Sequence, residues 1–113
     1  MRTRQSKLAD EIRDILAGCF TTQVSDPRVQ SVVVTYVKIT RDLQLASVYF
    51  RVYDQKHPLE EVEQGLQSCK GFLRKNLGDN LELRRVPNLR FFHDDSIDKG
   101  SSVESLIQKI KDD

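Results

Sequence analysis

The sequence predicts an α+β domain in which helices cover one face of a three-stranded mixed sheet. Apolar residues recur every three or four positions in 6–20 and again in 59–77, the spacing of amphipathic helices. Residues 31–39 and 43–53 are rich in β-branched residues or alternate apolar with polar ones, as strands do. Only a tight turn separates these two strands, so they must pair antiparallel. A third strand at 89–93 follows a helix and can pair in parallel through a right-handed crossover.

The first helix is expected to run from Ser6, a candidate N-cap, to Phe20. It should end before the loop 25–28, because the aspartate and proline there both disfavour a continued helix. In the strand 43–53 one face is apolar and the other mostly polar, which indicates a strand buried on one side.

The second helix is expected to open at Pro58 and to stop at Gly78. Gly71 lies inside this helix, where a glycine costs roughly 1 kcal/mol relative to alanine. A glycine there is useful if the helix kinks or if another backbone comes very close. The sequence therefore predicts an interhelical kink at Cys69, Lys70 and Gly71. The alternative is a glycine tolerated for packing of the helix on the sheet.

Residues 101–104 resemble a capping box, and an apolar stripe at helical spacing accompanies them, which predicts a C-terminal helix. The stripe consists of Val103, Leu106, Ile107 and Ile110. With 113 residues the chain is expected to form one domain spanning 1–113, and flexible terminal residues are compatible with this.

The net charge of +1 conceals a segregation of charge along the chain. Residues 1–53 carry eight cations against five anions, and residues 64–93 carry six against two. The segment 54–63 and the tail 94–113 each sum to −3. This distribution is compatible with a basic face opposed by an acidic rim, although charges mixed over a solvated surface would also produce it.

The residue pattern favours a binding protein over an enzyme. The two histidines, His57 and His93, are far apart in sequence, and neither has a partner at catalytic spacing. The two cysteines, Cys19 and Cys69, form no Cys-x-x-Cys pair and are expected to be reduced, buried thiols. There is no glycine-rich phosphate loop and no apolar run of membrane-spanning length. No export signal is evident, and neither a metal, a cofactor nor a small-molecule substrate is expected.

The predicted elements follow the order α-β-β-α-kink-α-β, with a C-terminal helix. This is the order of a type II KH-like domain, an RNA-binding fold. Ferredoxin-like domains also alternate helices and strands, so the order alone does not separate the two folds. Short motifs spread over nearly the whole chain resemble, in order and spacing, the ribosome-binding factor A family. They are Asp26-Pro27-Arg28, Thr40-Arg41-Asp42-Leu43, Ala46-x-Val48-Tyr49, Gly71-Phe72-Leu73-Arg74, Leu77-Gly78, Leu83-Arg84, Val86-Pro87-x-Leu89-x-Phe91 and Asp94-Asp95-Ser96-x-x-x-Gly100.

The resemblance implies a type II KH fold whose kink has the form Ala-x-Gly. Here Cys69 stands at the alanine position and Gly71 is retained. It also implies a role in late maturation of the bacterial small (30S) ribosomal subunit, with binding to immature subunits near the 5′ end and decoding-site helices of 16S rRNA. Such proteins aid rRNA processing and growth in the cold. We accordingly expect a cytoplasmic monomer whose partners are the free 30S subunit and its 16S rRNA.

Candidate RNA-binding residues are the cations of the kink and of neighbouring elements, which would contact phosphates without reading sequence. They are Arg2, Arg4, Lys7, Arg28, Arg41, Lys70, Arg74, Lys75, Arg84, Arg85 and Arg90. Arg28 and Arg41 each have a loop aspartate nearby and could instead brace those loops.

Three tyrosines, Tyr36, Tyr49 and Tyr53, could stack on unpaired bases or simply fill strand positions. Two further functions remain open at this point. One is a stand-alone KH-like module for short single-stranded nucleic acid. The other, weaker one is a protein-interaction adaptor that uses its acidic rim.

Overall fold

The computed structural model describes residues 3–95, and the expected C-terminal helix lies outside this range. The elements along the chain are α1 (Arg4–Thr22), a short 3-10 helix η1 (Pro27–Val29), β1 (Val32–Ile39), β2 (Leu45–Val52), α2 (Leu59–Asn80) and β3 (Asn88–His93). The strands form one sheet in the order β1-β2-β3, with β1 antiparallel and β3 parallel to β2. The predicted α+β class and mixed three-stranded sheet are confirmed.

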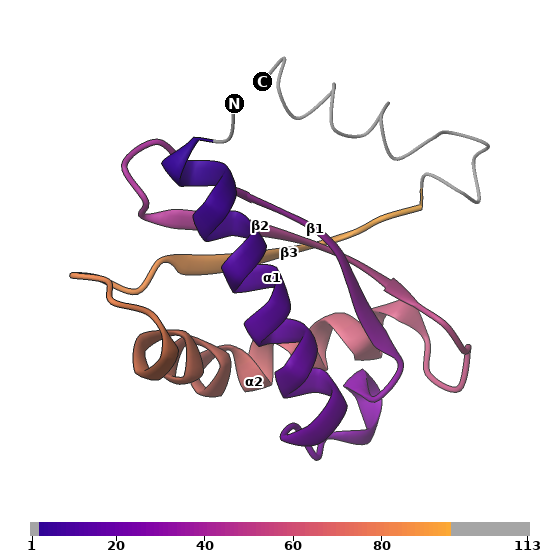
Figure 1. Cartoon of the computed structure of the whole chain (residues 1–113). Coiled ribbons are helices and arrows are strands. Elements are labelled where there is room, and N and C mark those ends of the chain that lie inside the picture. The colour runs from indigo at the N-terminus through magenta and orange to yellow at the C-terminus, as the bar shows by residue number, and fades with distance from the viewer. Residues whose placement is uncertain (1–2, 96–113) are drawn as a thin grey trace.

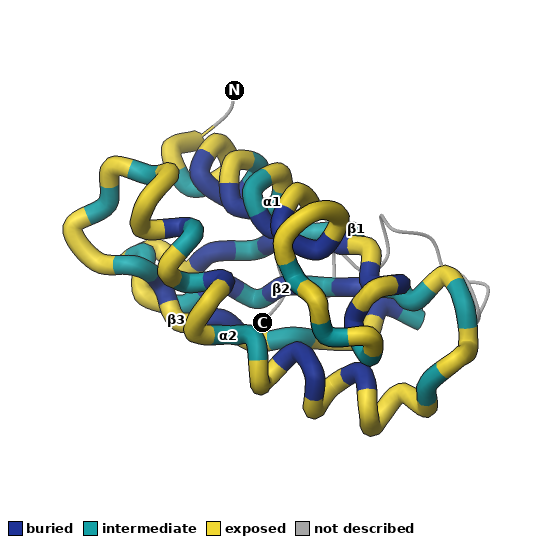
Figure 2. Tube along the Cα trace, turned by 90° about the horizontal axis from the view of Figure 1, so that it is seen from below, coloured by how far each residue is buried: buried dark blue, intermediate teal, exposed yellow. Residues whose placement is uncertain are grey.

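Both long helices pack against the same face of the sheet (Figure 1). The core residues with no exposure include Ile12 and Leu16 of α1, Leu66 and Leu73 of α2, and Phe50 of β2. Figure 2 shows the buried stretches gathered on the strands and on the inner sides of the helices. Burial of these apolar stripes, whose helical and strand periods the sequence displays, is the main force that holds the layers together.

The first helix begins earlier than expected. Thr3 is its N-cap, and Ser6 occupies the third helical position. The Ser6 backbone N–H donates to Thr3 Oγ1 at 3.1 Å, and the Thr3 backbone N–H donates to Ser6 Oγ at 3.0 Å. Ser6 as N-cap was therefore wrong, because the pair forms a reciprocal capping box that satisfies two otherwise unpaired N–H groups.

The expected division of the second helix at Cys69–Gly71 is also wrong. α2 is one helix of 22 residues that continues through this segment. Gly71 is exposed, and a Cβ added there would meet no atom within 4 Å, so no close backbone approach requires a glycine at this position. The helix also passes Gly78 and ends at Asn80. A Cβ at Gly78 would lie 3.1 Å from Val86 Cγ2, so this glycine serves packing of the following loop and does not stop the helix.

The sheet contains one irregularity, at Thr35. Val34 pairs with Phe50, but Tyr36 pairs with Tyr49, so Thr35 is an extra residue in β1.

Cys19 and Cys69 are free thiols, as expected, and burial raises the pKa of both, that of Cys69 to about 11. None of the helices in the described part of the chain is long and apolar enough to cross a membrane.

Candidate nucleic-acid interface

Three segments meet at one end of the molecule: the start of α1, the β1–β2 turn and the α2–β3 connection (Figure 1). The parallel register places Asn88, the first residue of β3, beside Leu45, the first of β2. The Asn88 N–H donates to the carbonyl of Gln44 in the turn at 2.8 Å. The Gln5 side-chain amide of α1 donates to the carbonyl of Ile39 at 3.2 Å, which ties α1 to the end of β1.

The β1–β2 turn is held by its own polar residues. Thr40 Oγ1 donates to Asp42 Oδ1 at 2.7 Å, and the same carboxylate oxygen accepts the Gln44 N–H at 3.1 Å. These bonds hold the pKa of Asp42 below its usual value, the Thr40 hydroxyl being the larger cause. Leu43 adopts a left-handed φ of 62°, which is uncommon for a branched apolar residue and holds the turn tight. Arg41 is exposed at the tip, so bracing by Thr40 leaves its guanidinium available for binding.

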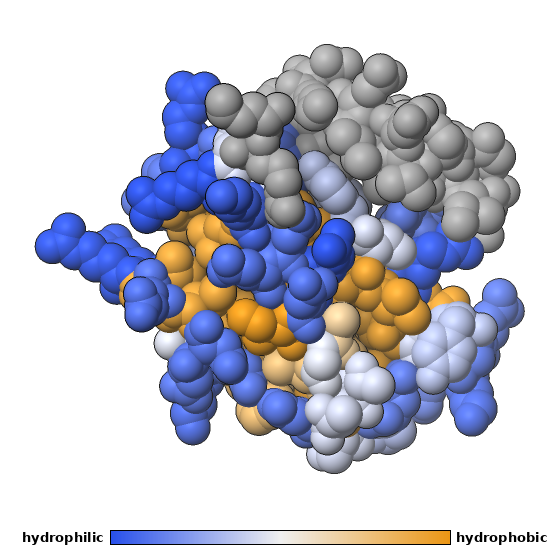
Figure 3. All heavy atoms as spheres, viewed as in Figure 1, coloured by the Kyte–Doolittle hydropathy of each residue, from blue (hydrophilic) through white to orange (hydrophobic). Residues whose placement is uncertain are grey.

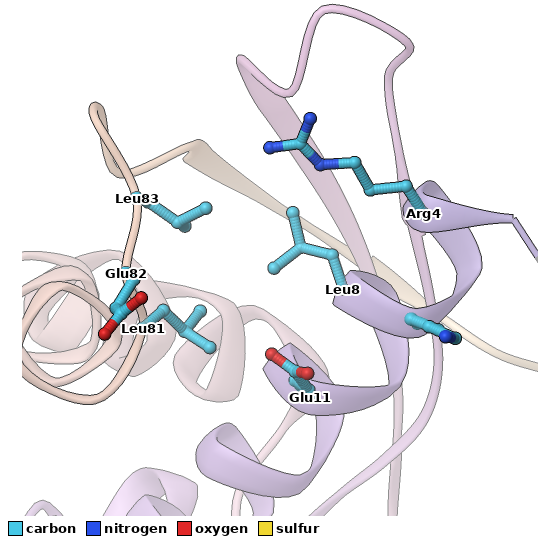
Figure 4. A pocket seen from close by; sticks show the side chains of 7 residues that line it. Arg4, Leu8, Glu11, Leu81, Glu82 and Leu83 are labelled. Carbon is cyan, nitrogen blue, oxygen red and sulfur yellow. The ribbon is translucent and has the colours of Figure 1, made fainter.

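A cavity of about 420 Å³ separates α1 from the α2–β3 connection. In Figure 4, Leu8, Leu81 and Leu83 point into a shared space. Charged residues, among them Arg4, line it as well. A second cavity of about 270 Å³ is lined by Arg4 together with the β1–β2 turn and the loop that carries Arg84 and Arg85. Arg4 thus borders both cavities.

We call the five cations at this end the basic end: Arg4, Lys7, Arg41, Arg84 and Arg85. All five are exposed. Figure 3 shows hydrophilic side chains projecting around apolar surface on this side of the molecule. Glu11, Asp42 and Glu82 lie among them, so the local excess of positive charge is smaller than the number of cations suggests.

Arg74 of α2 is part of the scaffold. Its Nε donates to the carbonyl of Pro87 at 3.1 Å and its Nη2 to that of Val86 at 3.0 Å. The guanidinium therefore fixes the α2–β3 connection, the segment that presents two arginines of the basic end. Its proposed phosphate contact would compete with these two hydrogen bonds.

Arg28 braces its loop through an aspartate, which is the alternative to phosphate contact that the sequence analysis left open. Its Nη2 lies 2.7 Å from Asp26 Oδ2, and its Nε donates to Asp26 Oδ1 at 3.1 Å. The Arg28 side-chain hydrogen bond is the main cause that lowers the pKa of Asp26. Arg28 Nη2 also reaches Ser68 Oγ of α2 at 3.5 Å, so the pair holds η1 against that helix.

Gly65 is the residue that the sequence analysis missed. A Cβ there would lie 2.9 Å from Val29 Cγ1 and 3.1 Å from Arg28 Cβ, so the close approach expected at Gly71 occurs here. The helical spacing of the sequence could have identified this glycine, because Gly65 lies on the buried stripe of the helix between Val62 and Leu66, whereas Gly71 lies off that stripe.

The remaining candidates do not join the basic end. Lys70 is half-buried and Lys75 exposed, both on α2, and Arg90 is exposed on the face of β3 turned away from the helices. Arg2 lies outside the described residues.

The aromatic candidates divide between two places. Tyr36 and Tyr49 pair across β1 and β2, with ring centroids 6.0 Å apart. Phe92 of β3, which the sequence analysis did not single out, continues the row at 5.3 Å from Tyr49. Tyr53 lies apart and donates its hydroxyl to the carbonyl of Gln30. The bulge and the parallel register create this row, and neither could be located from the sequence.

His57 and His93 line one cavity of about 430 Å³ near the start of α2, so the structure brings together two residues that are distant in sequence. His57 Nδ1 lies 3.2 Å from Glu61 Oε2. Within residues 3–95, no group of three or more His, Cys, Asp or Glu side chains is arranged to hold a metal ion.

Comparisons with known proteins give one consistent result. The profile of the family described as Ribosome-binding factor A matches residues 4–107. A ribosome-binding factor A of Geotalea uraniireducens is 37% identical over 110 residues, which cover 97% of this chain and 90% of the relative. One of Dictyoglomus thermophilum is 39% identical over 113 residues, covering 99% and 92%.

Solved structures agree in fold. The crystal structure of ribosome-binding factor A from Thermus thermophilus aligns with a TM-score of 0.70 at 23% identity and covers 80% of this chain and 97% of that one. A homology model of the Thermus thermophilus protein, fitted into a cryo-EM map of a complex with the 30S subunit, aligns with a TM-score of 0.64 at 23% identity. It covers 77% of this chain and 91% of that one.

Proposed function

Because the chain belongs to the ribosome-binding factor A family, we propose that it binds immature small ribosomal subunits and assists their late maturation, including 16S rRNA processing. The observation that carries the proposal is the convergence of five exposed cations from three segments at the basic end. The 30S complex described for the Thermus thermophilus relative supports the small subunit as the partner.

The geometry of the basic end suits phosphate contact. Its guanidinium groups can each donate two parallel hydrogen bonds to a phosphate. The segments that carry them are held by hydrogen bonds within the protein, from Thr40 to Asp42 in the turn and from Arg74 to the α2–β3 connection. Segments that are already held in place lose less conformational freedom on association, so more of the electrostatic attraction remains as affinity. Since the net charge of the whole chain is only +1, attraction to RNA depends on this local cluster and on the orientation in which the protein approaches.

Arg28 and Arg74 act in this proposal as positioning residues that hold the loops around the site. Lys70, Lys75 and Arg90 remain outer contacts for rRNA beyond the basic end. The protein works as a cytoplasmic monomer that binds RNA without catalysis, without a cofactor and without a small-molecule substrate. Its benefit to the cell is expected to be largest in the cold, when misfolded rRNA rearranges most slowly.

The test measures co-sedimentation with immature 30S subunits over a series of salt concentrations. We expect the double variant Arg84→Glu, Arg85→Glu to bind more weakly and to flatten the logarithmic salt slope by about 0.7–0.9 for each phosphate that the protein no longer neutralises. The control is Lys56→Glu, which reverses one exposed cation outside the basic end, so the effects are compared for each reversed charge. If the double variant stays folded and loses no more binding for each reversed charge than the control at every salt concentration, the basic end is not the RNA interface.

A stand-alone module for single-stranded nucleic acid is the second candidate function. The aromatic row of Tyr36, Tyr49 and Phe92 favours it, because aromatic side chains on a sheet can stack on unpaired bases. This function predicts tight binding to short free oligonucleotides and no enrichment on small subunits. The ribosomal proposal predicts the reverse, so the same sedimentation experiment with added oligonucleotide separates them.

A further inference from the structure

The sheet has a second face, turned away from α1 and α2, which no described element covers. We call it the open face; its side chains come from Val33, Tyr36, Lys38, Ser47, Tyr49, Arg51, Arg90 and Phe92. Val33 is 47% exposed and Phe92 is 41% exposed, and the three aromatic rings form a row across the strands. A soluble protein gains stability when such an apolar patch is covered.

The orientation of the rings indicates what kind of cover fits. The ring planes of Tyr49 and Phe92 lie within 25° of each other at 5.3 Å, so the two rings stack on one another across neighbouring strands. Because the two rings stack on one another, part of their flat faces is already occupied. Less of each face is then left for a nucleobase, whereas aliphatic side chains can pack on the rings in any orientation.

The chain leaves β3 on this same side. Asp94 follows Phe92 by two residues and therefore lies on the open face by strand alternation. It is buried: its N–H donates to the carbonyl of Phe50 at 2.7 Å, and its Oδ2 accepts the Thr35 hydroxyl at 3.0 Å. Since Thr35 is the bulged residue of β1, the carboxylate reaches across β2. The end of the described chain is thus held against the open face.

The segment that follows has the length and pattern of a cover. Residues 101–113 carry the apolar stripe of Val103, Leu106, Ile107 and Ile110 behind a capping sequence. A helix over 103–110 would be about 12 Å long at 1.5 Å per residue, and the eight-residue strands β1 and β2 extend about 26 Å. The linker 96–100 can extend roughly 17 Å, more than the width of about 10 Å across three strands.

We propose that residues 101–113 form a helix that docks on the open face and completes a second layer over the sheet. The apolar stripe would cover Val33, Phe92 and the tyrosine rings. The tail 94–113, with six anions against three cations, would place its excess negative charge near Lys38 and Arg90. The aromatic row is then closed to RNA while the helix is in place. This inference does not depend on ribosome binding.

Hydrogen exchange of the full chain tests the proposal, because docking protects amides in 103–110 from exchange. The variant Phe92→Ser should lower that protection about tenfold or more, since it removes a ring from the proposed contact. Phe72→Ser is the matched control, because Phe72 is similarly exposed, at 43%, but lies on α2. The reciprocal variant Leu106→Asp should abolish protection of the segment and shift the NMR resonances of Val33 and Tyr49.

Three results would overturn the proposal. The first is exchange of 103–110 at the rate of an unstructured peptide, or protection that Phe92→Ser and Phe72→Ser reduce equally. The second is protection that rises with protein concentration, which would make a second copy of the chain the occupant. The third is perturbation of the Tyr36, Tyr49 and Phe92 rings by single-stranded RNA in the full chain, with 103–110 unprotected, which would make RNA the occupant.

Discussion

Replacing Gly65 and Gly71 with alanine, one at a time, separates the two glycines of α2 by their surroundings. At Gly71 a Cβ meets nothing within 4 Å, so Gly71→Ala adds only the helix-forming advantage of alanine. That advantage is about 0.8–1.0 kcal/mol. At Gly65 the same methyl group would lie 2.9 Å from Val29 Cγ1, closer than unbonded carbon atoms approach. Overpacking of this kind costs about 1–3 kcal/mol.

The two contributions oppose each other in Gly65→Ala. Alanine recovers about 1 kcal/mol of helix propensity while the clash with η1 costs about 1–3 kcal/mol, so the net loss is about 0–2 kcal/mol. Arg28 Cβ also lies close to the added methyl group, at 3.1 Å, so η1 cannot yield by a side-chain rotation alone. We expect the cost to fall in the upper half of that range, with the two variants differing by about 2–3 kcal/mol.

Urea denaturation of the parent and both variants measures the difference, with the slopes compared to confirm that the unfolded states match. In thermal unfolding each kcal/mol should shift Tm by roughly 4 °C for a domain of this size. The reasoning is refuted if Gly71→Ala destabilises the protein as much as Gly65→Ala does. That outcome would mean that the helix needs its glycine at 71 for a bend or a close contact.

The environments of three other side chains lead to further predictions. Arg74→Ala should lower the free energy of unfolding by about 2 kcal/mol, because two loop carbonyls lose a charged donor. Arg74→Lys should restore little of this stability, since an ammonium group cannot donate from two separate nitrogens as the guanidinium does. Urea denaturation measures the stability of both variants. The folded-state pKa of Asp26 is lowered by Arg28, so the stability it contributes is present above its unfolded pKa and is lost as the pH falls through the folded value. Asp26→Asn should therefore flatten the loss of stability below about pH 4, measured as unfolding against pH. Because burial raises the pKa of Cys69 to about 11, its thiol should react with a disulfide reagent at about pH 8 far more slowly than a model thiol. Rapid reaction of Cys69 in the folded protein would contradict that environment.

The local elements of the fold could be read from the sequence because each carries its own period. The stripe through Leu8, Ile12 and Leu16 predicted α1, and the short turn after Ile39 predicted an antiparallel hairpin. Boundaries were less predictable. The N-cap moved from Ser6 to Thr3 because both hydroxyls can cap, and only the direction of the chain before the helix decides between them.

The site was less accessible to sequence reasoning, because binding depends on which side chains are already engaged. Arg74 and Arg84 are both arginines in a basic stretch of the sequence. In the structure, Arg74 bonds two loop carbonyls, whereas Arg84 is exposed beside Arg4, eighty residues away along the chain. Composition and spacing report how many cations a segment carries, but not which of them tertiary contacts use.

The class of the fold, the hairpin and the parallel crossover follow from local periodicity and from the lengths of the connections, so all three could be predicted before the structure was known. Three properties depend instead on long-range contacts: which glycine lies at the close approach, which arginines support the loops and which cations meet at one end. Those properties arise where β3 aligns with β2 and η1 meets α2, and such contacts join residues that the sequence places far apart.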